Sequence, residues 1–129
     1  MSLLRCALLF PLLVFGVGCS RSTANWAEEL KSADSAQRLH AVLTLQKRTN
    51  EPKTVVPLLI QTLGDEDVFV RRDAARGLGH FGVAAQPAIP ALRMLLRDPE
   101  PSVRKAAQQA LVKIDPNTET NAVAKADPR

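Results

Sequence analysis

A chain of 129 residues has room for one domain at most. Its formal net charge of +4 is far below that of a typical nucleic-acid-binding domain, and four Phe, one Trp and no Tyr are too few to stack bases. Nucleic acid is therefore excluded as an expected partner, and the mild positive charge favours acidic partners only weakly.

The first 18 residues have the layout of a cleaved secretory signal. Arg5 is the one charged residue before Cys19, an apolar run extends from Cys6 to Val17, and Pro11 interrupts it. Such a run is too short for a permanent membrane helix. We therefore expect residues 1–18 to be absent from the mature chain.

The segment Phe15-Gly16-Val17-Gly18-Cys19 resembles the lipobox of bacterial lipoproteins. The resemblance implies that Cys19 becomes the first mature residue and carries acyl groups such as palmitate, with residues 19–23 as a lipidated tether. Ser20 implies no retention at the inner membrane, hence the periplasmic side of the outer membrane. Gly16 departs from the usual Leu, and the alternative is an ordinary signal followed by an incidental cysteine. With Cys6 removed, no disulfide is expected.

A repeat of 33 residues organises the rest of the chain. Val56–Asp65 aligns with Ile89–Asp98, and Val70–Leu78 aligns with Val103–Leu111 at the same offset. Arg38, Ala41 and Leu45 extend the repeat backwards more faintly. The sequence thus predicts one module over residues 24–115 with three units, 24–50, 54–82 and 87–115, of which the first is degenerate.

Each unit is expected to hold two helices. Apolar residues recur at three- and four-residue steps, as in an amphipathic helix. In unit two they are Val55, Val56, Leu59, Ile60 and Leu63 for the first helix, and Val70, Ala74, Leu78 and Phe81 for the second. Gly64–Asp67 and Asp98–Pro101 are the turns, and Pro87 and Pro90 lie near a helix start. No segment alternates like a strand, so the predicted class is all-α, followed by a disordered polar tail over 116–129.

The pattern Asp-x-x-x-x-Val-Arg-x-x-Ala-Ala-x-x-Leu extends from Asp65 to Leu78, and from Asp98 to Leu111 with Gln108 in place of the second Ala. It resembles HEAT repeats, in particular the short variety named after phycobilin lyases. The resemblance implies a short α-solenoid of about three antiparallel helix pairs, whose second helices line a concave surface. The lyase namesake implies an enzyme acting on a bilin, but the repeat offers no catalytic residue to carry over.

The resemblance also implies a ladder of hydrogen bonds between neighbouring units. Its members here are Asp65, Arg71, Asp98 and Arg104. An arginine fork at a stacking interface can satisfy turn carbonyls and carboxylates together, so we expect a structural role for these residues. Ser32 replaces the aspartate in unit one and interrupts the ladder there, unless Asp34 substitutes for it.

A second set of polar residues lies four apart on the second helices, away from the buried stripe. These residues are Arg72, Arg76, His80, Lys105, Gln109 and Lys113. In a stack they form a basic face that could bind an acidic protein segment, a headgroup or a polyanion. The alternative is a solvated helix face. Leu39 and Leu43 fall at the matching positions of unit one, as an apolar anchor or as packing for the N-terminal segment.

No catalytic or metal-binding motif is present in the sequence. His40 and His80 have no ligand-spaced partner, and Asp65-Glu66-Asp67 lacks the spaced ligands of a calcium loop. Gly77, Gly79 and Gly82 spell Gly-x-Gly-x-x-Gly, but on a helix and its exit rather than after a strand. We therefore expect no enzyme, no metal and no cofactor.

Taken together, these features predict a membrane-tethered, non-catalytic interaction scaffold or adaptor of the bacterial cell envelope. Two alternatives stay open: a binder of an anionic ligand through the basic face, and a non-catalytic or lyase-like subunit of an enzyme complex. Unit three ends at Ile114 without an evident capping helix, so that end is expected to dock a partner or self-associate. The partner and the oligomeric state are not specified by the sequence.

Overall fold

The computed structural model describes residues 23–117, where helices joined by short turns make up the fold and no strand is present. The elements are α1 (Thr23–Glu29), α2 (Ser35–Leu45), α3 (Pro52–Thr62), α4 (Val68–His80), the 3-10 helix η1 (Gly82–Ala88), α5 (Ile89–Leu95) and α6 (Pro101–Ile114). The all-α solenoid of helix pairs predicted from the repeat is confirmed. Within residues 23–117, no helix combines the length and the apolar character needed to cross a membrane.

Three of the predicted segments lie wholly or mostly outside this description. The signal over 1–18 and the acylated Cys19 are not among the described residues, and of the tether only Thr23 is, as the first residue of α1. Of the tail, Pro116 and Asn117 form a turn after α6. The expectations about export, lipid and the polar tail therefore stay predictions.

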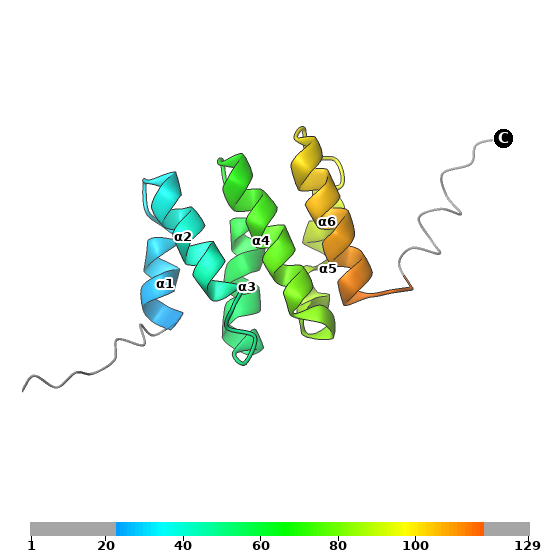
Figure 1. Cartoon of the computed structure of the whole chain (residues 1–129), viewed down its shortest axis with the longest axis horizontal. Helices are drawn as coiled ribbons and strands as arrows, with labels where there is room; N and C mark the ends of the chain where they lie inside the picture. The colour runs from blue at the N-terminus through cyan, green and yellow to red at the C-terminus, as the bar shows by residue number, and fades with distance from the viewer. Residues whose placement is uncertain (1–22, 118–129) are drawn as a thin grey trace, which may run out of the picture.

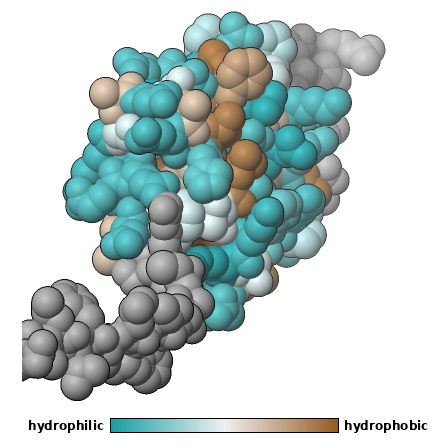
Figure 2. Space-filling view, turned by 60° about the vertical axis from the view of Figure 1, so that its left-hand side comes forward, coloured by the Kyte–Doolittle hydropathy of each residue, from teal (hydrophilic) through white to brown (hydrophobic). Residues whose placement is uncertain are grey.

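The helices form two layers. In Figure 1, α2, α4 and α6 lie side by side in front, and α3 and α5 lie behind them. Within each pair the helices pack on each other, and between pairs the contact of α4 with α6 is the most extensive. Figure 2 brings the α1 end of the stack forward and shows a mostly hydrophilic surface crossed by a narrow hydrophobic stripe.

The core follows the repeat positions. Fully buried leucines recur at matching places, Leu45 in α2 and Leu78 in α4, and Leu59 in α3 and Leu92 in α5. Small residues then let the second helices approach closely. A Cβ added to Gly79 would lie 3.1 Å from the Cα of Ala110 on α6. Burial of these apolar side chains is the main stabilising contribution, as in any solenoid without disulfides.

The turns between paired helices are closed by carboxylates. Asp67 caps α4 by accepting hydrogen bonds from the amides of Phe69 and Val70, at 2.8 and 3.2 Å. Asp34 caps α2 through the amide of Ala36. These bonds satisfy amides that a helix start leaves without a partner. Asp34 is therefore a cap, not the substitute for the aspartate that unit one lacks.

The connection from unit two to unit three is a 3-10 helix that the sequence did not predict. Gly82 ends α4 in a left-handed conformation, with φ of 51°, which glycine adopts without a Cβ clash. The chain then continues as η1 through Pro87 and buries Ala85 and Ala88 against the core. Because η1 occupies residues 82–88, helix α5 is only seven residues long.

Candidate functional site

A ladder of arginine forks joins the units. Arg71 donates from Nε and Nη2 to the carboxylate of Asp98 in the next unit, at 2.9 and 3.2 Å. Its Nη1 donates to the carbonyl oxygens of Asp65 and Glu66 in its own turn, at 2.8 and 3.0 Å. One planar side chain thus fixes the turn of unit two and attaches unit three to it.

Arg38 repeats this geometry one unit earlier. It donates to Asp65 at 2.8 and 3.0 Å and to the carbonyl of Ser32 at 2.8 Å. The absence of an aspartate at position 32 therefore leaves this rung intact, because Arg38 uses only the backbone there. The hydrogen bond with Asp65 is the main cause that raises the pKa of Arg38 above its ordinary value, against the opposing effect of burial.

Asp98 shows the same balance from the acidic side. Its burial alone would raise the pKa, but hydrogen bonds from Arg71 and from the amide of Glu100, with the charges of Arg71 and Arg104, outweigh it. The net pKa of Asp98 lies below its ordinary value. The carboxylate is thus charged in the folded chain at neutral pH.

The predicted basic face is divided into three parts by the structure. Four of its six residues line one polar depression of about 100 Å³ between α4 and α6, which we call the α4–α6 groove. They are Arg76, His80, Gln109 and Lys113, with Gly79, Ala106 and Ala110 as its other lining residues. Lys105 is exposed and Arg72 is partly buried, and neither lines this groove.

Arg72 is held away from the groove by two neighbours. It donates to the carboxylate of Asp73 at 3.0 and 3.2 Å, and its guanidinium carbon lies 5.1 Å from the centre of the Phe69 ring. The hydrogen bond with Asp73 raises the pKa of Arg72, although burial opposes it. This positive charge is largely neutralised within α4.

Asp73 is the residue that the sequence analysis missed. It is buried, and it also accepts from Nη1 of Arg76 at 3.4 Å, where Arg76 keeps 59% of its side chain exposed. Asp73 aligns with Ala106 and His40, so the repeat gives it no weight. A single acidic residue between two arginines of a basic helix was the available signal.

The groove that results is cationic. Arg76 shares Asp73 through one long contact, and Lys113 and His80 are exposed at its rim, without an ion pair in the described part of the chain. The carbonyl and amide of Gln109 add one acceptor and two donors. Such a set can bind a carboxylate or another small anion through charge-assisted hydrogen bonds.

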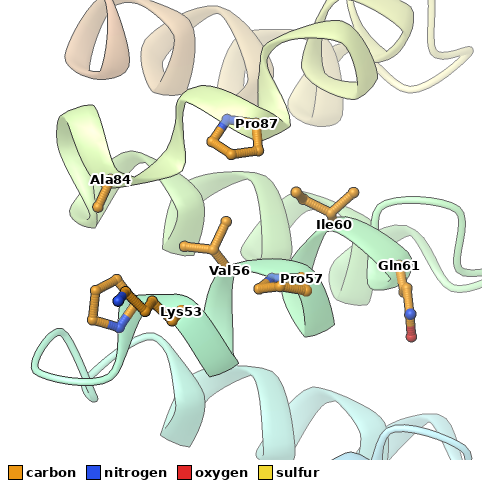
Figure 3. Close-up of a pocket in the computed structure, with 8 residues that line it drawn as sticks. Lys53, Val56, Pro57, Ile60, Gln61, Ala84 and Pro87 are labelled. Carbon is orange, nitrogen blue, oxygen red and sulfur yellow. The ribbon is translucent and has the colours of Figure 1, made fainter.

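A larger apolar depression lies on the other helix layer, between α3 and η1. It encloses about 690 Å³, and Figure 3 shows Val56 and Ile60 of α3 facing Pro87 of η1, with Ala84 beside them. Lys53 and Gln61 are its polar lining residues. No residue pattern in the sequence predicts this depression, because it depends on η1.

Residues 23–117 contain no group of three or more His, Cys, Asp or Glu arranged to hold a metal ion. The two histidines have different surroundings. The ring of His40 lies 5.5 Å from that of Trp26, and His80 lines the α4–α6 groove. The three glycines Gly77, Gly79 and Gly82 lie on α4 and at its exit.

Comparisons with known proteins agree with this geometry. A model of the family described as HEAT repeats matches residues 23–112. Among solved structures, the complex of CpcE and CpcF of phycocyanin lyase from Nostoc sp. PCC7120 has a chain that is similar with a TM-score of 0.70 and 32% identity. The match covers 81% of this chain and 41% of that chain, so this chain spans less than half the length of the solved one. Among curated proteins, none matches.

One expectation from the sequence is wrong. We expected no enzyme, whereas the solved structure that the chain resembles, at 32% identity, is that of a lyase. The expectation depended on the lack of a catalytic motif. The residues that recur along this chain serve packing and the ladder, and such residues say nothing about catalysis in either direction.

Proposed function

Because this chain belongs to the HEAT-repeat family, we propose that it is a protein-binding subunit of a lyase-related complex. The similarity to a chain in the complex of CpcE and CpcF of phycocyanin lyase supports this reading over a free-standing scaffold. Stacked helix pairs present long continuous faces, which suit them to bind protein segments. The coverage of 41% of the solved chain leaves the rest of that protein without a counterpart here.

We place the binding site in the α4–α6 groove. Its volume of about 100 Å³ is that of a few water molecules, which is enough for one carboxylate group but not for a large cofactor. Arg76, His80 and Lys113 surround it, and Asp73 only partly offsets the positive charge of Arg76 and Lys113. An acidic side chain on a partner segment fits this size and charge.

The test is purification of the full chain from its native host, with Arg76→Glu/Lys113→Glu compared with wild type. Reversing both charges turns two attractions with an acidic partner into two repulsions and should lower recovery of the partner about tenfold, which corresponds to about 1.4 kcal/mol of binding free energy. Lys47→Glu/Arg93→Glu is the matched control, because both residues are exposed and outside the groove. Equal recovery with both double variants would remove the groove from the proposal.

The nature of the recovered partner tests whether the complex is related to a lyase. A partner subunit with lyase activity supports the lyase-related reading. If the groove variant loses a partner that has no such activity, the chain is an interaction module outside any lyase complex.

We further propose that Cys19 carries lipid and holds the module at the periplasmic side of the outer membrane. The lipobox-like sequence before Cys19 supports this proposal. Radiolabelled palmitate should label wild type and not Cys19→Ser, and the variant should leave the membrane fraction. Labelling of both chains, or of neither, would contradict the tether.

A further inference from the structure

The α5–α6 end of the stack carries an arginine fork whose outer half has no partner. Nη1 of Arg104 donates to the carbonyls of Asp98 and Pro99, at 2.7 and 2.9 Å, as Arg71 does in its own turn. Arg38 and Arg71 each direct Nε and Nη2 at an aspartate of the following unit. Within residues 23–117, nothing accepts from these two nitrogens of Arg104. The fork is therefore fixed in place and open on one side.

The same end exposes an apolar residue whose counterpart in unit two is buried and whose counterpart in unit one, Leu30, is partly buried. Leu63 and Leu96 occupy one repeat position; Leu63 is 2% exposed, whereas Leu96 is 39% exposed. Met94, two residues earlier on α5, is 75% exposed. A further helix pair packed on unit three would bury apolar surface of Leu96 that is exposed in this chain alone.

The outer side of α6 carries side chains similar in size to those with which unit one contacts unit two. A shallow depression of about 370 Å³ there is lined by Gln108, Gln109, Val112 and Lys113, of which Gln109 and Lys113 also line the α4–α6 groove. The counterparts of Gln108 and Val112 in unit one are Val42 and Gln46, which are similar in size. Val42 is fully buried, and the Cβ of Gln46 lies 3.0 Å from where a Cβ on Gly77 would be. Side chains of this size can thus meet a next unit, provided that it has a glycine at the position of Gly77.

From these three observations we propose that the α5–α6 end binds a HEAT-type helix pair of a different protein chain. That pair supplies an aspartate from its inter-helix turn to Nε and Nη2 of Arg104, and a glycine opposite Val112. The inference rests on the proposed protein-binding function and names the class of partner. It uses Arg104 and Leu96, neither of which lines the α4–α6 groove.

A second copy of this chain does not meet these requirements. In a head-to-tail stack, unit one would bring Ser32 to the place of the aspartate and Thr44 to the place of the glycine. Arg104 would then face a neutral hydroxyl, and Val112 would face a β-branched side chain where the inner units have Gly77 and Ala110. Both mismatches act against self-assembly.

The experiment places a benzoylphenylalanine photocrosslinker at Gln108 of the full chain in its native host. Gln108 is exposed and lines the depression on the outer side of α6. The expected product joins position 108 to a second protein, and mass spectrometry maps the joined peptide to a helix pair whose turn contains an aspartate. A crosslink to a second copy of this chain, to its own residues 118–129, to a protein without helical repeats, or to nothing would overturn the inference.

Three variants of the crosslinking chain then test the contact itself. Arg104→Gln should lower the crosslink yield at least about tenfold, because the partner aspartate loses a charged, bidentate donor. Leu96→Lys should lower it similarly; Leu96 is 39% exposed in the chain alone, and circular dichroism at 222 nm checks that this variant keeps its helices. Lys105→Gln removes the same charge from the next residue of α6 and should leave the yield unchanged. Unchanged yield with both Arg104→Gln and Leu96→Lys would refute the docking. Arg76 lines the groove and not this depression, so a loss with Arg104→Gln and Leu96→Lys that Arg76→Glu alone does not reproduce is separable from loss at the groove.

Discussion

Replacing Arg71 with Met should destabilise the folded chain by about 3–4 kcal/mol. The side chains of Arg71 and Asp98 are 14% and 8% exposed, so the substitution leaves a nearly buried carboxylate without its two guanidinium bonds. Removing one partner of a buried pair costs about 3–5 kcal/mol, and the partial exposure of Arg71 favours the lower half of that range. The side chain of Met retains the apolar packing of the arginine stem.

Arg104→Met is the matched control for this prediction. Arg104 makes the same two bonds to turn carbonyls but has no carboxylate across units in the described chain. Its loss should cost only about 1 kcal/mol, because water can replace a donor at these open carbonyls. The difference of about 2–3 kcal/mol between the two variants measures one rung of the ladder.

Urea unfolding followed by circular dichroism at 222 nm gives both free energies from midpoints and slopes. The slope should be the same in the three proteins if each unfolds in one step. Equal destabilisation by Arg71→Met and Arg104→Met would refute the idea that the carboxylate across units, and not the turn, is what Arg71 stabilises.

Three further predictions concern pH and packing. The pKa of Asp98 is depressed below 3.8 in the folded chain, so the stability that its carboxylate contributes is present above that pH and is lost as pH falls through the folded value. Asp98→Asn should therefore lower the free energy of unfolding at pH 7 and make that free energy fall less steeply in acid. Urea titrations from pH 7 to 2 measure both effects. Gly79→Val should destabilise by about 1–3 kcal/mol in thermal melts, because its Cβ would meet the backbone of Ala110 at 3.1 Å; an unchanged melting temperature would mean that α4 and α6 separate easily. Gly82→Ala should cost about 1–2 kcal/mol, since φ is 51° there, whereas Gly64→Ala, with open space around it, serves as the neutral control.

The fold could be predicted because the repeat constrains it at many places together. Leu45 and Leu78, and Leu59 and Leu92, are equivalent residues, and each pair is fully buried. The predicted fold does not depend on the exact end of any helix or on any single contact, because the apolar period recurs in all three units. The η1 helix escaped it because Gly82–Ala88 has no counterpart between units one and two, where the chain makes only a short turn.

The candidate site was predicted less completely, for a related reason. Matching positions identify what units share, and the α4–α6 groove also depends on what they do not share. Asp73 has neutral or basic counterparts, yet it determines which arginine stays available, by holding Arg72 and only touching Arg76. A comparison of the units cannot show the importance of Asp73, because no other unit has an acidic residue there. Its effect becomes visible only when α4 and α6 are placed side by side.

The uneven packing between neighbouring units has a consequence for how the protein opens. The contact between α4 and α6 is more extensive than that between α2 and α4, and η1 adds to the former while only a short turn links α2 to α3. Units two and three should therefore behave as one cooperative block, with α1 and α2 as a separate, weaker one. In hydrogen exchange the amides of α2 would open without global unfolding, so the end nearest the N-terminus can loosen while the groove stays assembled.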